Sequence, residues 1–189
     1  MINKNYNLGE LEELLMNEPS FKSAKTIDLN VPKVPGLYCI KIKNMDALLA
    51  PFNTELKNRK HNIIYIGIAT KSLNKRMLNQ ELRANGHGTF FRSLGAVLGY
   101  QPPFNSLAGK KNKRNYKFSD SDETKIINWI NENLLINWIE QNSNLEEIET
   151  ALIFKYKPLL NIAKNLVAMR ELSRLRKMCV EVANGNRNK

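Results

Sequence analysis

The sequence has few residues of the types that crosslink small domains or hold structural metals. It contains two cysteines and two histidines among 189 residues. Neither Cys39 nor Cys179 belongs to a CxxC or Cys/His pattern, and both have apolar neighbours. This argues against a disulfide framework and against a zinc site, and it is typical of two free core thiols in a reducing compartment.

Long apolar runs are also missing. No segment approaches the roughly 20 apolar residues that a membrane-spanning helix needs. The first seven residues lack the apolar core of a signal peptide. We therefore expect a cytoplasmic protein without a membrane-bound part, and the length favours one domain with terminal extensions.

Acidic residues are scarce relative to basic ones. The chain has 29 Lys and Arg residues against 18 Asp and Glu, which gives a net charge of +11 and a pI near 9.7. Such an excess favours a polyanionic partner, with nucleic acid as the first candidate. The alternative is a basic surface that is only solvated.

Three short segments have the composition of strands. Residues 62–69 are apolar and β-branched, and the segment is too short for an ordinary helix. Residues 37–42 form a second apolar segment after a Pro-Gly turn, and residues 134–140 form a third. With helices between the strands, this predicts an α+β fold in which helices flank a small three-stranded sheet.

Helix start and stop signals occur along most of the remaining chain. Six segments are predicted to be helices: 7–18, 71–84, 89–98, 119–131, 144–156 and 166–183. Capping-box patterns are found at Asn7 and at Asn144. The connection 43–61 contains two possible helical turns around Pro51. We expect a helical extension over 1–34, a central domain over 35–165, and a helix and tail over 166–189 packed on that domain.

Polar residues at the strand ends and in one helix form an ordered series. Gly36-Leu37-Tyr38 is followed by Tyr65-Ile66-Gly67, then by Arg76, and much later by Glu149 and Asn161 around a Lys-Tyr-Lys-Pro turn. This order resembles the signature of the GIY-YIG nuclease superfamily over about residues 35–165. The superfamily includes the nuclease domain of excision-repair incision proteins, homing endonucleases and some restriction enzymes.

The resemblance implies a metal-dependent endonuclease that hydrolyses phosphodiester bonds in DNA with Mg²⁺ or Mn²⁺. Glu149 would be the metal ligand, and Arg76 would clamp the phosphate oxygens. Tyr38 would be the general base, although a free phenol has a pKa of about 10 and needs a nearby cation to lower it. Tyr65 would orient water or phosphate, and Asn161 would hold the site together.

The sequence departs from the superfamily pattern at three points. Leu37 replaces the usual Ile, and the connection 43–61 between the two tyrosines is longer than usual. Ile68 stands where many members have a lysine after the second glycine. Lys71 or Lys75 could supply that phosphate contact instead.

Further cations and one histidine are candidates for the same site. His87, in a Gly-His-Gly turn, could swing towards Tyr38 as a proton acceptor, or it could simply be a turn residue. Arg92 is a candidate phosphate contact. A basic loop is expected to grip the nucleic-acid backbone rather than read bases, through Lys110, Lys111, Lys113 and Arg114.

Two other functions remain open from the sequence. The first is a nucleic-acid-binding module on the same fold with little catalytic activity. The second is an RNA-cleaving relative, which we expect less than a DNA-cleaving one. The sequence makes no prediction about the oligomeric state.

Overall fold

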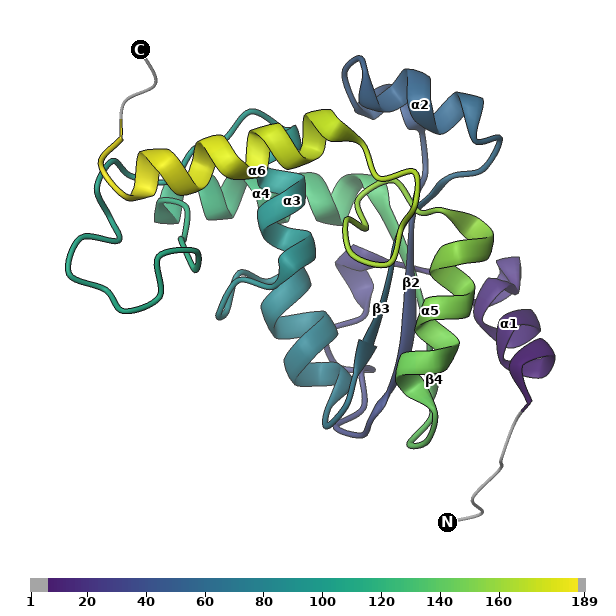
Figure 1. Cartoon of the computed structure of the whole chain (residues 1–189). Helices are drawn as coiled ribbons and strands as arrows, with labels where there is room; N and C mark the ends of the chain where they lie inside the picture. Colours follow the sequence, from purple (N-terminus) through teal and green to yellow (C-terminus); the bar gives the residue numbers. More distant parts are fainter. Residues whose placement is uncertain (1–6, 187–189) are drawn as a thin grey trace.

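An antiparallel sheet lies at the centre of the computed structural model, which describes residues 7–186 (Figure 1). The first six residues lie outside the described residues. They belong to the N-terminal segment in which no signal peptide is expected from the sequence. The strand order is β1–β4–β2–β3. The strands are β1 (Lys22–Ser23), β2 (Gly36–Ile42), β3 (Ile63–Ala69) and β4 (Leu134–Glu140).

The sheet has four strands instead of the three that the sequence predicts. The additional strand, β1, is two residues long and pairs with the start of β4, with Lys22 opposite Ile136. Two residues are too few to show the alternating pattern by which strands are recognised in a sequence. The predicted strand at 134–140 is confirmed with the same bounds.

Strand β2 is the buried centre of the sheet, since all seven of its residues are buried. Its side chains alternate between the two faces, as the pleat of a strand requires. Leu37 and Cys39 belong to one hydrophobic core, and Tyr38, Ile40 and Ile42 belong to the other. Each face of β2 is therefore covered by its own layer.

Two helices cover the Leu37 face, and a larger group covers the Tyr38 face (Figure 1). The first pair is α1 (Leu8–Met16) and α5 (Leu145–Tyr156). The Tyr38 face is covered by α2 (Phe52–Asn58), η4 (Asn74–Leu82), α3 (Thr89–Val97), α4 (Asp120–Asn133) and α6 (Arg170–Ala183). Short 3₁₀ turns are η1 (Glu18–Ser20), η2 (Ala24–Thr26) and η3 (Met45–Ala47). In the described part of the chain, none of the helices has the length and apolar character needed to cross a bilayer.

Helix boundaries follow the capping signals in part. The capping box at Asn7 is confirmed, with hydrogen bonds in both directions between Asn7 and Glu10. The capping box predicted at Asn144 is wrong, because this residue has a left-handed backbone (φ 54°) and its side chain makes no capping bond. Helix α6 begins at Arg170 and not at 166, since the Asn165 side chain accepts from the Val167 amide and holds the preceding residues in a turn.

Candidate active site

One glycine allows two tyrosine rings to share one face of the sheet, and a second allows β2 to approach β4 closely. Tyr38 on β2 lies opposite Gly67 on β3, and Tyr65 is two residues before Gly67. A Cβ atom at Gly67 would lie 2.6 Å from Tyr38 Oη and 2.9 Å from Tyr65 Cε1. The rings stack with their centroids 6.2 Å apart. At the start of β2, a Cβ on Gly36 would lie 2.1 Å from the Ile139 carbonyl oxygen of β4.

Both phenols are deeply buried and neutral in this environment. Tyr38 is 0% exposed and Tyr65 is 6% exposed. Burial, reinforced by the negative charge of Glu81, raises the pKa of both tyrosines, and the Arg76 charge partly opposes this. The Tyr38 hydroxyl forms no aligned hydrogen bond with any described residue, although the Arg76 guanidinium lies beside it. An unsatisfied buried hydroxyl is uncommon and is compatible with a group kept ready for a ligand.

Arg76 is held by a helix of unusual geometry. The segment predicted as an ordinary helix over 71–84 contains a nine-residue π-helix, η4. In a π-helix each backbone N–H bonds to the carbonyl five residues earlier, so residues five apart lie on the same side. Accordingly, Arg76 Nη2 is 2.8 Å from Glu81 Oε1, and the Asn79 side chain donates to the Asn74 carbonyl at 3.0 Å.

Glu81 links Arg76 to the start of α3. It is fully buried, and its Oε2 accepts hydrogen bonds from the Phe90 and Phe91 amides at 2.8 and 3.3 Å. A Cβ on Gly88 would lie 1.8 Å from the same oxygen, so only glycine fits there. Sequence reasoning missed Glu81, because in an α-helix a residue five positions after Arg76 points away from it.

Glu149 lies on α5, far along the chain from the two tyrosines. Its charge acts on both Tyr38 and Tyr65. The Lys164 ammonium lies 2.6 Å from Glu149 Oε2 and 2.8 Å from Glu146 Oε2. Although burial lowers the pKa of Lys164, its pairing with the two carboxylates leaves the pKa raised. The charges of Arg76 and Glu149 thus both act on the stacked pair Tyr38 and Tyr65, and sequence reasoning missed Lys164.

The residues around Glu149 fit one kind of metal site. Among residues 7–186 there is no group of three or more His, Cys, Asp or Glu side chains that could enclose an ion. Mg²⁺ commonly binds through one or two carboxylates, while water and substrate phosphate supply its other ligands. Glu149 and Glu146 offer two carboxylates, and they already face a cation in the Lys164 ammonium. The donor set therefore fits an ion bound together with substrate, and not a closed structural site.

Asn161 binds the outer edge of β3. Its Oδ1 accepts from the Ile66 amide at 3.0 Å, and its Nδ2 donates to the Ile66 carbonyl at 2.9 Å. The Leu160 amide donates to the Ile64 carbonyl at 2.8 Å. The segment containing Asn161 thus fixes the backbone between Tyr65 and Gly67, and Asn161 acts on the site through this strand.

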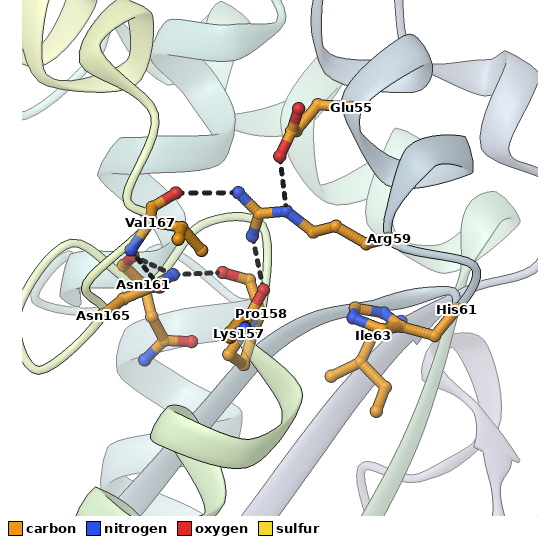
Figure 2. Close-up of polar contacts among 9 residues, drawn as sticks. All are labelled: Glu55, Arg59, His61, Ile63, Lys157, Pro158, Asn161, Asn165 and Val167. Carbon is orange, nitrogen blue, oxygen red and sulfur yellow. Dashed lines mark hydrogen bonds and ion pairs between the residues drawn. The ribbon is translucent and has the colours of Figure 1, made fainter.

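The loop that carries Asn161 and Lys164 is anchored by Arg59, at the end of the long 43–61 connection (Figure 2). The Arg59 guanidinium donates to the carbonyls of Lys157 and Val167, the latter at 2.9 Å, and pairs with Glu55 at 2.8 Å. Inside the loop, Asn165 donates to the carbonyls of Pro158 and Asn161. The connection therefore braces the candidate site from outside.

His87 lies in a separate group of side chains. Its Nε2 is 2.9 Å from Glu123 Oε1, and its ring packs against Phe91 and Phe118. Burial, with Lys117 and Arg92 as further causes, lowers the pKa of His87 to about 4. No contact between His87 and Tyr38 is found among residues 7–186.

The remaining predicted phosphate contacts are cations on η4, on α3 and in the 110–114 loop, and Lys71 just before η4. Arg92 on α3 is half-buried, and its guanidinium donates to Asn115. Lys71 and Lys75 are exposed just before and within η4. The four cations of the 110–114 loop are exposed as well, and Lys113 donates to the Leu107 carbonyl.

Comparisons with known proteins give one match. The model of the GIY-YIG catalytic domain family matches residues 36–178, which is more than half of the chain. The matched segment includes β2, β3, η4 and α5, from which the four converging side chains come. No curated protein and no solved structure matched the chain. The family match and the converging tyrosines, arginine and glutamate identify this chain as a member of the GIY-YIG nuclease superfamily.

Proposed function

We propose that this chain is a divalent-metal-dependent endonuclease that hydrolyses phosphodiester bonds in DNA. The observation that carries the proposal is that the charges of Arg76 and Glu149, from two other elements, converge electrostatically on the stacked pair Tyr38 and Tyr65. Phosphodiester hydrolysis needs a positioned water, charge neutralisation on the phosphate and stabilisation of the leaving oxygen. The convergence supports these functions in one place.

Arg76 is proposed to bind the oxygens of the phosphate that is cleaved. Its guanidinium is about one-third exposed, while its other side is held by the fully buried Glu81. An arginine fixed by a buried carboxylate loses little further freedom when it binds a phosphate. Burial lowers the pKa of Arg76, but Glu81 and the two tyrosines raise it overall, so the side chain stays charged.

Tyr38 is proposed to take the proton of the attacking water, with Tyr65 orienting that water or the phosphate. Burial and Glu81 oppose ionisation of Tyr38, whereas Arg76 favours it. The hydroxyl is therefore neutral in the free protein. Additional positive charge must enter the site to lower its pKa, so that the phenolate can form and act as a base at neutral pH. Asn161 is proposed to keep β3, and with it Tyr65, in place.

Glu149 is proposed as the protein ligand of the divalent cation, with Lys164 as its partner before the cation arrives. A bound Mg²⁺ or Mn²⁺ would supply positive charge that polarises the phosphate and lowers the pKa of neighbouring groups. The exposed cations at 71, 75 and 110–114 are proposed to contact other backbone phosphates. His87 is proposed to support the packing between α3 and α4 rather than to transfer protons.

A binding module on the same fold is the second candidate. It is favoured by the Lys164–Glu149 pair and by the raised pKa of Tyr38, since both leave the site in a non-reactive form. The test is incubation of the protein with plasmid DNA, single-stranded DNA and RNA, each with Mg²⁺, with Mn²⁺ or with EDTA. Metal-dependent nicking of plasmid DNA supports the endonuclease. Cleavage of RNA alone would indicate an RNA-cleaving relative, and binding without cleavage would favour the module.

A further inference from the structure

Two arginines from different helices lie over the Tyr116 ring. Arg92 comes from α3 and Arg176 from α6, and their Cζ atoms lie 5.9 and 5.7 Å from the ring centroid. Tyr116 itself is 0% exposed. At these distances each guanidinium is attracted by the face of the ring. The ring thus holds two positive charges near each other.

The positive charges of this pair are not balanced by a carboxylate. Neither Arg92 nor Arg176 has an acidic group within ion-pair distance in the part of the chain that the structure describes. Arg176 Nη1 donates to the Thr89 carbonyl and to Ser93 Oγ, both at 2.9 Å, and Arg92 donates to Asn115. The Nε atoms of both arginines are buried without a described hydrogen-bond partner.

The pair also lies within electrostatic reach of the site. After burial, the charge of Arg176 lowers the pKa of Arg92, and Arg76 lowers it further, whereas Tyr116 and Glu81 raise it. Arg176 likewise lowers the pKa of Tyr65. Arg76 and Arg92 both act on the single buried carboxylate of Glu81, and Arg176 acts in turn on Arg92, which leaves an excess of positive charge that an anion would relieve.

The basic surface continues beyond Arg92. Asn115, which accepts a hydrogen bond from Arg92, also lines a pocket of about 480 Å³. Lys110, Lys111 and Lys117 line the same pocket. A pocket lined by three lysines, with Arg92 bonded to its Asn115, suits a polymer with repeated phosphates better than an isolated anion.

We propose that Arg92 and Arg176 together bind one further phosphate group of the nucleic acid, next to the phosphate that Arg76 holds. This inference rests on the proposed function and adds α6 to the nucleic-acid interface. Two guanidinium forks around one phosphate provide several charge-assisted hydrogen bonds, and the Tyr116 ring keeps both forks in place. The phosphate supplies the negative charge that no acidic side chain provides to this pair of arginines.

The test is a double-substitution series in a binding assay. Arg92→Gln, Arg176→Gln and the double variant are titrated with a short DNA duplex in EDTA at several salt concentrations. Each single variant is expected to bind about ten-fold more weakly. Each should also flatten the slope of log K against log salt by about 0.9, the value for one phosphate.

The double variant decides whether the two arginines share a phosphate. If they do, its slope changes by the same 0.9 as in each single variant, because the same contact is lost. A change of about 1.8, or no change in any variant, would overturn the proposal. Arg174→Gln is the matched control, since Arg174 is an exposed residue of the same helix paired with Glu171, and it should leave the slope unchanged.

Two further measurements distinguish a failure of this inference from a failure of the proposed function and from misfolding of a variant. Wild-type cleavage of plasmid DNA is measured in parallel, and its absence would contradict the endonuclease while the binding arm still tests the arginine pair. Thermal melting of every variant is recorded. If Arg176→Gln fails to fold, Arg92→Gln remains decisive, because its side chain contacts a loop and not a helix: an unchanged salt slope in that variant overturns the proposal.

Discussion

Arg76 and Glu81 are five residues apart and form an ion pair in which Nη2 and Oε1 are separated by 2.8 Å. The π-helix makes this spacing possible, and the same carboxylate receives the first amides of α3. The arginine that would bind the substrate is thus connected through one buried residue to the next helix. Its position depends on the geometry of η4 as much as on its own rotamer.

The first prediction concerns Glu81→Gln. Glutamine keeps an oxygen that can accept from the Phe90 and Phe91 amides, but it removes the charge that fixes Arg76. We expect cleavage to fall by about 10², the effect of a catalytic group displaced by about 1 Å. The fold should be retained. The measurement is a plasmid-nicking time course beside a thermal melt, with the exposed Glu13→Gln as control. Nicking at the wild-type rate would show that Glu81 does not position Arg76.

The second prediction separates stability from activity at Tyr38. Its hydroxyl is buried beside the Arg76 guanidinium without an aligned hydrogen bond, so Tyr38→Phe removes a polar group that is at most weakly bonded. The free energy of unfolding should stay the same or rise slightly, while cleavage falls by at least about 10² if the hydroxyl transfers a proton.

Tyr156→Phe is the matched control for that substitution. The Tyr156 hydroxyl donates to Glu12, away from the site, so its loss should lower stability by about 1 kcal/mol and leave cleavage intact. Urea unfolding and nicking assays are run on both variants. A Tyr38→Phe protein that is strongly destabilised, or that cleaves normally, contradicts the assignment.

The third prediction concerns Arg59, which braces the loop containing Asn161 and Lys164. Arg59→Met removes donors to the Lys157 and Val167 carbonyls and should lower the free energy of unfolding by about 2–3 kcal/mol. Lys57→Met, two residues earlier in α2 and in an exposed ion pair with Asp46, should change it by less than about 1 kcal/mol. Equal denaturation midpoints for the two variants would show that Arg59 contributes no more to stability than Lys57 does.

The fourth prediction is a pH dependence from His87. The pKa of His87 is lowered to about 4 by burial, and an unfolded chain has a histidine pKa of about 6.5. Between these values the unfolded chain binds more protons, so stability should fall as the pH drops from 7 to 5, by on the order of 2 kcal/mol from this residue. His87→Gln should lose that part of the pH dependence. Urea midpoints at both pH values test this, and an unchanged dependence in the variant would place the titration elsewhere.

The sequence predicts the parts of this protein that depend on local patterns. Apolar β-branched runs identify β2, β3 and β4, and the order of Tyr38, Tyr65, Arg76 and Glu149 indicates the site. The strand β1 is too short to leave such a pattern. The capping motif at Asn144 is present in the sequence, yet the chain enters α5 through a left-handed residue instead.

The contacts missed from the sequence are those made by long side chains across the fold. Arg59 reaches residues about a hundred positions away, and Arg176 on α6 bonds to α3. Glu81 was missed for another reason, because its pairing with Arg76 requires a π-helix that no propensity rule predicts. Such contacts leave no spacing rule in the sequence, and only the packed structure reveals them.

The most direct test of metal-dependent cleavage at Glu149 is a comparison of Glu149→Gln with the wild type. Glutamine preserves size and one oxygen but removes the charge that would hold a hard cation. DNA binding is measured by gel shift and cleavage by plasmid nicking, both in Mg²⁺. We predict that the variant binds as tightly as the wild type and nicks at least about 10²–10³ times more slowly. Nicking by the variant at the wild-type rate would show that Glu149 does not hold a catalytic cation.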